Sequence, residues 1–503
     1  MPSHRPPRLL AVLLVGVAAY RFGLLGRGAL AFVDETFYFT SVKALEAIAS
    51  RDVTGAVTSL AQARGRTGAA ILQIPIAALQ AIPAHFGVPA SNLRSLLIPT
   101  SLNVLVSLLS TYFVFAIGAA LTGSEAAALV STVMYALLVN SNLYVRHVLP
   151  YDWALCAGLV ALWLAFTRPQ LRGLVAWTGV LAGGVLTIYT GYYPFCAVIG
   201  VAVLWQQWSK PDAVAVRDTI LFAASAAVVV VVTELLFRAG GLSYLANLRD
   251  VRRDIAFTSF GDGWTFLPEY LVDVERLSGV VLVLGSVAYA ARAAIRFSRG
   301  VLRPIDRIAL PMLLACAWQA IASAYLHAIP LFGRLLHPWM PFLAWMLADS
   351  LAAVSPGRLR VAAFAAVIGA AAISFVLSAR EYLPLKYPPD VLYAMGVDTE
   401  RLTPDHKLCE LYPGTSYASP GPLNRTTREP YDVRTDYVLL NFCQALPAVP
   451  RPKQAASIPA GTTRLFDGPY WMTFPAYAYE GLTREDRAAI RRDGYRLQVF
   501  ASR

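Results

Sequence analysis

Two adjacent carboxylates, Asp34 and Glu35, follow the first hydrophobic run of the chain, in the stretch AFVDETFYFTS at residues 31–41. A carboxylate at a membrane interface can act as a general base, because partial loss of water and a neighbouring acid raise its pKa toward the working range. The alternative is structural: Asp34 caps a helix and Glu35 interacts with the helix dipole, each worth about 1 kcal/mol or less. The chemistry expected of the pair is removal of a proton from a hydroxyl or amine.

A second polar group lies in YVRHVLPYDW, residues 144–153, where Arg146 and His147 precede Asp152. The functional interpretation is that Asp152 positions an acceptor or shares a proton with Asp34. A divalent metal between the two acids stays open, although their spacing does not indicate one. The alternative is an interfacial ion pair between Arg146 and Asp152, followed by a helix start with interface aromatics.

The third group, LFGRLLHPWMPF at 331–342, contains Arg334 and His337. A guanidinium binds phosphate oxygens bidentately and stabilises a departing phosphate, although an arginine near a bilayer surface often only extends toward water. The stretch TGYYPF at 190–195 adds Tyr192 and Tyr193, which are either ligands or aromatic residues of the membrane interface. These side chains favour binding of a lipid phosphate.

The sequence contains no GxxxxGK[ST] motif, no strand–GxGxxG–helix unit and no Cys/His cluster with metal-ligand spacing. It therefore lacks recognisable residues for a soluble nucleotide. Of its 503 residues, 57% are hydrophobic and 15% are charged, whereas soluble domains have about 45–50% and about 25%. This composition indicates a polytopic membrane protein. The net charge is +12, of which 16 Lys/Arg against 14 Asp/Glu from Arg380 onward leave about +10 for the membrane part. We expect this excess on cytoplasmic loops and expect no nucleic-acid partner.

Hydrophobic runs long enough to cross a bilayer predict the elements that position these groups. Eleven spans are expected, at 9–29, 94–121, 125–145, 153–167, 173–193, 195–208, 219–238, 279–297, 308–328, 335–353 and 361–379. The first run resembles a cleaved signal peptide, but we interpret it as a retained span because Arg21 interrupts it and no clear A-x-A site follows. A further run at 69–88 is ambiguous, because Pro75, Pro83 and Gln73 weaken it.

The distribution of arginines predicts the orientation of the chain. With eleven spans and a cytoplasmic N-terminus, the inside segments hold most of the basic residues, including the run Arg292, Arg296, Arg299, Arg303 and Arg307. Counting 69–88 as a span would place that run outside, so we predict a re-entrant or surface-lying pair of helices there. Residues 30–93 then form one external loop, in which Tyr38, Val42, Leu45 and Ile48 predict an amphipathic helix on the membrane.

Two further external parts are expected. Residues 239–278 have mixed charges and a GDGW turn, which suits a folded lid over a cavity. From about residue 381 the composition changes, and the runs 437–443 and 495–501 with a helix at 482–497 predict a small α/β or β-rich domain over 381–503. In an external domain Cys409 and Cys443 would form a disulfide or stay separate.

Together these features resemble the GT-C membrane glycosyltransferases. The resemblance covers roughly 1–380. It is carried by the Asp34–Glu35 pair opening a long external loop, Arg94 before the next span, an acid after the third span, and the R-x-x-x-P-x-x-P segment Arg334, Pro338 and Pro341. The most similar branches are the bacterial relatives of the protein O-mannosyltransferases, the lipid A aminoarabinose transferases and the galacturonosyl and mannosyl transferases of lipopolysaccharide.

The resemblance implies an all-α membrane domain that transfers a sugar from a polyprenyl-phosphate donor to an envelope lipid, glycan or protein, outside a bacterial inner membrane. It implies that Asp34 is the base, that Asp152 assists the acceptor or a metal, and that Arg334 stabilises the departing lipid phosphate. The substrate-binding candidates are Glu35, Lys43, Arg94, Arg146, His147, Tyr192, Tyr193, Arg334 and His337. Where the aminoarabinose branch tends to carry Lys-Gly at the end of the fifth span, this chain has Thr190-Gly191.

Two other classes of protein remain as alternatives. A transporter or flippase of a lipid-linked envelope component would carry ionisable groups near the bilayer midplane, broken helices and repeated halves. The sequence shows no internal repeat, and Glu234 and Asp349 lie close to span ends. A non-catalytic scaffold that displays the C-terminal domain would leave the Asp34–Glu35 loop without a role.

Overall fold

The structure is a computed structural model of the chain. It describes residues 8–28, 32–88, 90, 92–167, 172–207, 212–255, 263–326, 328, 331–353, 357–385 and 387, and short segments of the C-terminal part at 410–412, 415–416, 437–440, 463–469, 474–480, 484, 487–488 and 496–501. Cys409 and Cys443 lie outside the described residues, as does most of the helix predicted at 482–497.

The described part of the chain is mostly helical up to residue 382. Its elements are α1 (Arg8–Gly23), η1 (Val33–Tyr38), α2 (Phe39–Ala49), α3 (Val53–Ala61), α4 (Thr67–His85), α5 (Leu97–Thr122), α6 (Glu125–Leu137), α7 (Val139–Leu143), η2 (Tyr144–Arg146), α8 (Tyr151–Thr167), α9 (Arg172–Ile188), η3 (Thr190–Tyr192), α10 (Tyr193–Gln207), α11 (Asp212–Ala239), α12 (Tyr244–Ile255), η4 (Gly263–Thr265), α13 (Phe266–Ser298), α14 (Asp306–Ala324), η5 (Gly333–Trp339), α15 (Met340–Ala352) and α16 (Arg358–Tyr382).

Each of the eleven predicted hydrophobic segments overlaps one or more of these helices. Within the described residues, six helices are long and apolar enough to cross a membrane: α4, α5, α11, α13 with η4, α14 and α16. A seventh candidate is the pair at 125–137 and 139–146, which is bent by 58°. The chain therefore has the helical, apolar architecture of an α-helical membrane protein.

The external loop predicted at 30–93 is helical throughout most of its length. The amphipathic helix expected after the acids is α2, but it begins at Phe39, and its N-cap is Tyr38 with no side-chain cap. The N-cap alternative for Asp34 is therefore wrong. The run 69–88 forms a single helix, α4, in place of the expected pair, with Pro75 and Pro83 inside it.

The segment predicted as a lid at 239–278 contains α12, η4 and the first part of α13. Arg276 has φ 55° inside α13 and separates two helical stretches across a kink. The kink lies just before residue 279, the predicted start of a span. Gly279 has no side chain, so the carbonyl oxygen of Leu271 can approach its backbone; a Cβ at position 279 would lie only 1.7 Å from that oxygen. The second stretch of α13 then packs against α15 and α16.

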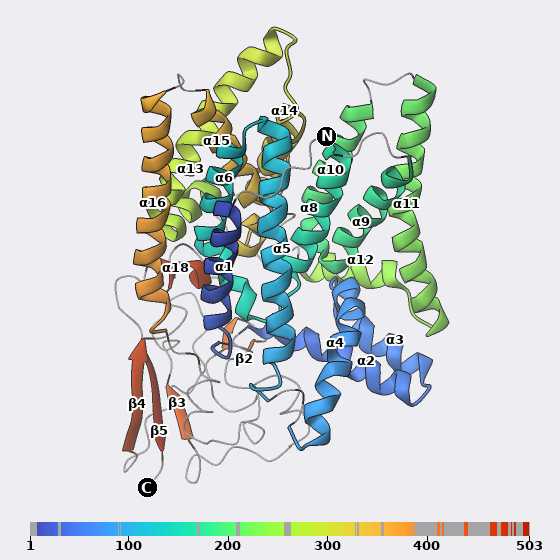
Figure 1. Ribbon diagram of the computed structural model, residues 1–503. Coiled ribbons are helices and arrows are strands. Elements are labelled where there is room, and N and C mark those ends of the chain that lie inside the picture. The colour runs from blue at the N-terminus through green and yellow to red at the C-terminus, as the bar shows by residue number, and fades with distance from the viewer. Residues whose placement is uncertain are drawn as a thin grey trace.

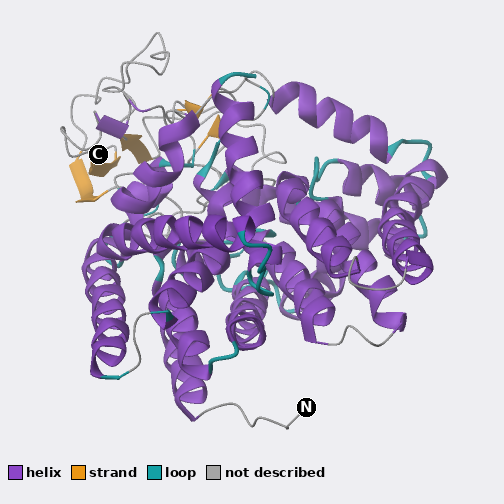
Figure 2. Cartoon of the chain, turned by 90° about the horizontal axis from the view of Figure 1, so that it is seen from above, coloured by secondary structure: helices purple, strands orange, loops and turns teal. Residues whose placement is uncertain are grey.

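Figure 1 shows that the helices of the bundle run roughly parallel to one another, with different segments gathered at its two ends. Helices α2, α3 and α4 lie at the same end as the strands, and the connection from α13 to α14 lies at the opposite end. Figure 2 shows the perpendicular view, in which the strands are grouped at one edge of the molecule. The arginine-rich 292–307 segment is therefore remote from the Asp34–Glu35 loop.

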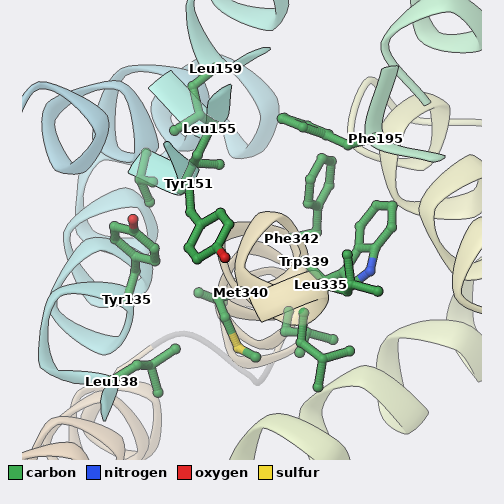
Figure 3. Packing of buried hydrophobic residues seen from close by; sticks show 14 of the residues in the cluster. Tyr135, Leu138, Tyr151, Leu155, Leu159, Phe195, Leu335, Trp339, Met340 and Phe342 are labelled. Atoms are coloured by element: carbon green, nitrogen blue, oxygen red, sulfur yellow. The ribbon is translucent and has the colours of Figure 1, made fainter. Parts of the chain in front are cut away.

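The largest buried cluster extends through most of the helical bundle, and part of it lies where α6, α8, α10 and α15 meet. Figure 3 shows Tyr135, Leu155, Phe195, Trp339 and Phe342 converging there from different helices. The aromatic rings of Phe195 and Phe342 pack edge to face with centroids 5.9 Å apart. This packed centre holds the ends of α8 and η5 in place, and these two elements carry residues of the site described below.

The described strands all come from the C-terminal part of the chain. They are β1 (Glu410–Tyr412), β2 (Thr415–Ser416), β3 (Tyr437–Leu440), β4 (Thr463–Pro469) and β5 (Arg496–Ala501), together with the short helix α18 (Pro475–Ala478). Strands β1 and β2 pair with each other, and a second sheet has the order β3-β5-β4 with antiparallel pairing. The runs predicted at 437–443 and 495–501 thus contribute β3 and β5, which pair directly.

Candidate active site

Glu35 anchors the turn that presents Asp34. Its side chain is fully buried, and its two oxygens accept hydrogen bonds from the backbone N–H groups of Phe32 and Val148, at 3.0 and 2.9 Å. The Nδ1 atom of His147 lies 3.0 Å from the same carboxylate. Glu35 therefore ties η1 to the 144–150 connection, which fits a supporting role better than a reacting one.

Asp34 points the other way, into a cluster of cationic and phenolic groups. Its Oδ2 atom lies 2.6 Å from Arg66 Nη2 and 3.3 Å from Arg334 Nη1. Tyr151 donates a hydrogen bond to the same oxygen at 3.1 Å. The Asp34 side chain keeps 20% of its surface exposed, so it is the acid of the pair that a ligand can reach.

The pKa of Asp34 differs from what the sequence suggests. Burial acts to raise it, but the positive charges of Arg66 and Arg334 and the hydrogen bond from Tyr151 outweigh burial and hold the pKa below its ordinary value. The expected rise toward neutral pH is therefore wrong for Asp34 in this state of the protein. Asp34 is ionised at neutral pH and serves as the counter-ion of two arginines.

Arg334 connects this carboxylate to a second one. Its Nη1 atom donates to Glu480 Oε2 at 3.1 Å, and its Nε atom donates to the hydroxyl of Tyr189 at 3.2 Å. The guanidinium also lies over the ring of Phe332, 4.0 Å from its centre. Tyr144 donates a short hydrogen bond to the other oxygen of Glu480. These contacts with Asp34, Glu480, Tyr189 and Phe332 fix the direction of the Arg334 side chain.

We call this group the two-arginine cluster; its members are Asp34, Arg66, Tyr151, Tyr189, Arg334 and Glu480. The Nε atom of Arg66 is buried and has no hydrogen-bond partner among the described residues, while its guanidinium lies over the ring of Phe37, 4.6 Å from the centre. Two guanidinium groups and two phenols gather around the Asp34 carboxylate, and groups of these kinds suit the binding of an anion.

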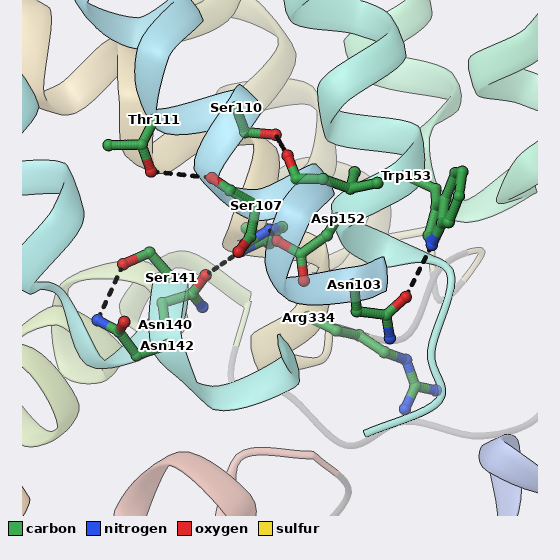
Figure 4. Close-up of polar contacts among 12 residues, drawn as sticks. Asn103, Ser107, Ser110, Thr111, Asn140, Ser141, Asn142, Asp152, Trp153 and Arg334 are labelled. Atoms are coloured by element: carbon green, nitrogen blue, oxygen red, sulfur yellow. Dashed lines mark hydrogen bonds and ion pairs between the residues drawn. The ribbon is translucent and has the colours of Figure 1, made fainter. Parts of the chain in front are cut away.

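Asp152 is placed in a neighbouring but different environment. It is 1% exposed, and its Oδ1 atom lies 3.4 Å from His337 Nε2. The other ring nitrogen of His337 lies 2.8 Å from Asn140 Oδ1. Figure 4 shows Asp152 among polar residues of α5 and α7, including Ser107 and Asn140. The structure therefore brings Asp152 and His337 together, while the adjacent Tyr151 is the residue of α8 that contacts Asp34.

Arg146 and His147 are buried against the C-terminal part of the chain. Arg146 donates to the hydroxyl of Tyr477 at 2.9 Å and lies over the ring of Tyr382, 3.9 Å from its centre. His147 Nε2 lies 2.9 Å from the same Tyr477 hydroxyl. Burial holds the pKa of His147 below its ordinary value, although Glu35 opposes this effect. Arg146 and His147 therefore support the site indirectly, through their contacts with the C-terminal part of the chain.

The remaining predicted residues lie apart or contribute through packing. Lys43 is exposed on α2, and Arg94 is exposed before α5. Tyr192 donates to the backbone carbonyl of Arg334 at 3.2 Å, so it positions that residue. Tyr193 is partly buried at the start of α10. No described interaction joins Lys43, Arg94 or Tyr193 to Asp34.

The part of the chain that the structure describes contains no set of side chains that could serve as ligands of a metal ion. No three His, Cys, Asp or Glu side chains there are close enough to hold an ion. The acids Asp34 and Glu480 instead face guanidinium groups, which compete with any cation for the same oxygens. The described residues of the two-arginine cluster therefore fit an anion better than a divalent metal.

Four members of the cluster were missed by sequence reasoning: Arg66, Tyr151, Tyr189 and Glu480. Arg66 lies in the segment ARGRTG, which reads as an ordinary basic turn before α4. Glu480 comes from the C-terminal part and follows Arg334 by 146 positions. Tyr151 lies next to Asp152 in a run of aromatic residues that is typical of a membrane interface. No local pattern distinguishes these residues, because only the fold brings them to Asp34 and Arg334.

The cluster combines an accessible carboxylate with two cations, so it can hold a negatively charged group beside a proton acceptor. Comparison with known proteins finds no match to any family model, curated protein or solved structure.

Proposed function

We propose that this chain is a membrane glycosyltransferase of the GT-C type, which moves a sugar from a polyprenyl-phosphate donor to an envelope lipid, glycan or protein. The observation that carries the proposal is the convergence of Asp34 with Arg66 and Arg334 at one end of an apolar helical bundle. Such an arrangement supplies a base and a phosphate site next to one another. The absence of nucleotide-binding motifs in the sequence favours a lipid-linked donor.

The finer architecture belongs to the same proposal. We place eleven spans in the membrane, the N-terminus in the cytoplasm, and residues 30–93 and the 381–503 domain outside a bacterial inner membrane. The remoteness of the 292–307 segment from α2–α4 supports this arrangement, because arginine-rich connections concentrate on the cytoplasmic side.

The reaction would be an in-line displacement at the anomeric carbon of the sugar. The acceptor hydroxyl oxygen forms the new bond to that carbon, and its proton passes to the carboxylate of Asp34. The bond between the anomeric carbon and the phosphate oxygen breaks, and its electron pair leaves with the polyprenyl phosphate. Arg66 and Arg334 stabilise the charge that develops on that phosphate.

The pairing of Asp34 with both arginines suggests how the base becomes active. A donor phosphate that binds Arg66 and Arg334 removes two positive charges from the surroundings of Asp34. The carboxylate then loses the interactions that hold its pKa low and becomes a stronger base. Binding of the donor would therefore prepare the proton acceptor for the second substrate.

One observation favours the transporter alternative. Helices α6 and α7 form a span candidate broken by 58°, and the backbone N–H groups at the start of α7 are bound by the buried Glu275. Broken helices with exposed termini are common in transporters. In this chain, however, the start of α7 already has its acceptor within the protein, which leaves no open terminus for a cargo.

The test is transfer of radiolabelled sugar from polyprenyl-phosphate donors by the purified protein in nanodiscs. We expect wild-type protein to transfer or hydrolyse the sugar and Asp34→Asn to lower the rate by about 10²–10⁴-fold, as loss of a general base does. Asp52→Asn serves as the matched control, because it makes the same chemical change at the N-cap of α3, where Asn caps as well as Asp.

Full turnover by Asp34→Asn at normal expression would contradict the role of Asp34. Movement of labelled lipid across vesicles without any loss of the sugar would support the transporter and refute the enzyme.

A further inference from the structure

A short C-terminal segment is inserted next to the two-arginine cluster. We call residues 474–480, with the sequence FPAYAYE, the C-terminal strap. Its residues Phe474, Tyr477, Tyr479 and Glu480 are each at most 6% exposed. A charged residue with so little exposure is unusual unless it is paired, so the burial of Glu480 is a specific feature of this contact.

Three anchors hold the strap against the helical part. The Tyr477 hydroxyl contacts Arg146 and His147, each at 2.9 Å. The Tyr479 hydroxyl donates to Asp273 Oδ2 at 2.6 Å. The backbone carbonyl of Tyr479 accepts from the N–H of Gly333 at 3.1 Å. These contacts bring the end of the strap directly beside Arg334.

Gly333, the residue before Arg334, is tightly packed against its neighbours. A Cβ on Gly333 would lie 2.9 Å from Glu480 Oε1 and 2.8 Å from the ring of Tyr270. Glu480 Oε2 accepts from Arg334 at 3.1 Å on the same Nη1 atom that faces Asp34 at 3.3 Å. One nitrogen of Arg334 thus serves two carboxylates, and a phosphate oxygen bound there would have to replace at least one of them.

We propose that Glu480 is a built-in stand-in for the donor phosphate, and that binding of a polyprenyl phosphate displaces it from Arg334 and releases the end of the strap. This inference rests on the proposed function. Asp34 stays in the site as the base, so Glu480 is the carboxylate that leaves. The exchange replaces one anion by another on the same guanidinium, which keeps the charge around Arg334 balanced in both states.

The chemistry of Glu480 favours its departure. Burial raises the pKa of Glu480, and the opposing effects of Arg334 and Tyr144 do not cancel the rise. Its charged form is therefore less favourable here than in water, and it gains hydration on release. A phosphate has more acceptor oxygens than a carboxylate, so it can engage Arg334 and Arg66 together, since both guanidinium groups lie beside the same oxygen of Asp34.

Two measurements on the full-length protein in nanodiscs of zwitterionic lipid test the proposal. The first is amide hydrogen exchange, since the N–H groups of residues 477–480 are hydrogen-bonded within the strap. We expect polyprenyl phosphate to increase exchange at 477–480 severalfold, while a polyprenol of the same length leaves it unchanged. Unchanged or slower exchange with bound polyprenyl phosphate would overturn the proposal.

The second is the affinity for polyprenyl phosphate in Glu480→Gln, which keeps the size of the side chain and removes its charge. We expect the Kd to fall about 3- to 10-fold, because the competing anion is lost. Glu269→Gln is the matched control, since Glu269 pairs with Arg484 at 2.9 Å and not with Arg334; its Kd should equal that of the wild type. An unchanged or higher Kd in Glu480→Gln would refute the stand-in role.

A third variant separates this inference from the proposed function. Arg334→Gln should weaken binding of polyprenyl phosphate in the wild-type and Glu480→Gln backgrounds alike. If Arg334→Gln binds as well as the wild type, or if no form binds the lipid, the phosphate site and the strap proposal both fail. If binding depends on Arg334 but not on Glu480, and the strap does not respond, only the strap proposal fails.

Discussion

At the residue scale, the site is organised around one carboxylate that is shared by two guanidinium groups. Asp34 neutralises Arg66 and Arg334, and a phosphate would take over that task. Under the proposed function, the same contacts that stabilise the cluster make Asp34 a weak base until the donor phosphate binds. The pH dependence of activity is the most direct measure of the interaction of Asp34 with the two arginines.

Arg66→Gln should move the acidic limb of the pH profile to higher pH. Asp34 must be ionised to accept a proton, and its pKa is held low partly by the charge of Arg66. Activity of the wild type is therefore lost only as the pH falls through this low pKa, and removal of Arg66 raises that pKa. The profile of kcat/KM against pH, which reports the free enzyme, measures the shift.

The same variant should raise the KM for the donor about 10-fold, because a charged hydrogen bond to phosphate is lost. Arg51→Gln is the control, since Arg51 is an exposed arginine at the end of α2, and we expect neither change from it. An acidic limb that stays in place, or moves to lower pH, in Arg66→Gln would contradict the pairing of Arg66 with Asp34.

At this scale the sequence points to Asp34, Glu35 and Arg334 more clearly than to the residues that surround them. The adjacency of Asp34 and Glu35 and their position after a hydrophobic run can be read directly, and Arg334 was named as a phosphate ligand. The partner Arg66 was not, because a basic turn in a loop has no pattern that points to a distant acid. The pKa of Asp34 was misjudged for the same reason: the charges that lower it come from other elements.

At the element scale, the break between α6 and α7 positions residues on both sides of the site. Glu275 of α13 accepts the N–H groups of Val139 and Asn140 at 2.7 and 2.8 Å, in place of the carbonyls of the preceding turn. Asn140 in turn donates to the hydroxyl of Tyr270 at 2.6 Å. The break therefore depends on a side chain from a distant helix, and it directs η2 and Tyr144 toward Glu480.

Glu275→Gln should destabilise the protein by about 1–3 kcal/mol, the usual cost of leaving a buried backbone donor without an acceptor. The amide retains one acceptor oxygen and places an NH₂ group against the other N–H. Thermal unfolding in detergent measures the loss as a lower Tm, with the exposed Glu46→Gln on α2 as the control. An unchanged Tm would mean that α7 does not depend on Glu275.

Hydrophobic runs predicted the helices well and their interruptions poorly. A run of apolar residues shows that a helix forms, because only helices satisfy the backbone in an apolar environment. At the bend after Leu137, Glu275 from a distant helix binds the backbone, so the local sequence does not indicate the bend. The kink at Arg276 is accompanied by a close approach at Gly279, and one glycine in a hydrophobic run does not by itself predict a kink. The single helix α4 likewise contains Pro75 and Pro83, which make the run ambiguous as a span in the sequence.

At the scale of the whole molecule, the candidate site is assembled from segments that are far apart in the chain. Asp34 and Arg66 come from the first loop, Tyr151 and Tyr189 from the ends of α8 and α9, and Glu480 from the C-terminal strap. All of them meet around Asp34 and Arg334, and helices α2–α4, which follow Asp34 in the chain, lie at one end of the bundle. An enzyme acting on a lipid-linked donor outside the cell requires this end to face the outside.

The orientation can be tested by labelling single cysteines in a background where the five native cysteines are replaced by serine. Glu46→Cys is exposed on α2, and Arg299→Cys is exposed at the opposite end of the bundle, between α13 and α14. We expect a membrane-impermeant maleimide to label Glu46→Cys on intact spheroplasts and to label Arg299→Cys only after permeabilisation. This follows from the concentration of arginines at 292–307, since cytoplasmic connections retain such residues. Labelling of Arg299→Cys on intact cells would place the two-arginine cluster on the cytoplasmic side, where soluble nucleotide sugars are available, and would remove the physical reason for a polyprenyl-phosphate donor.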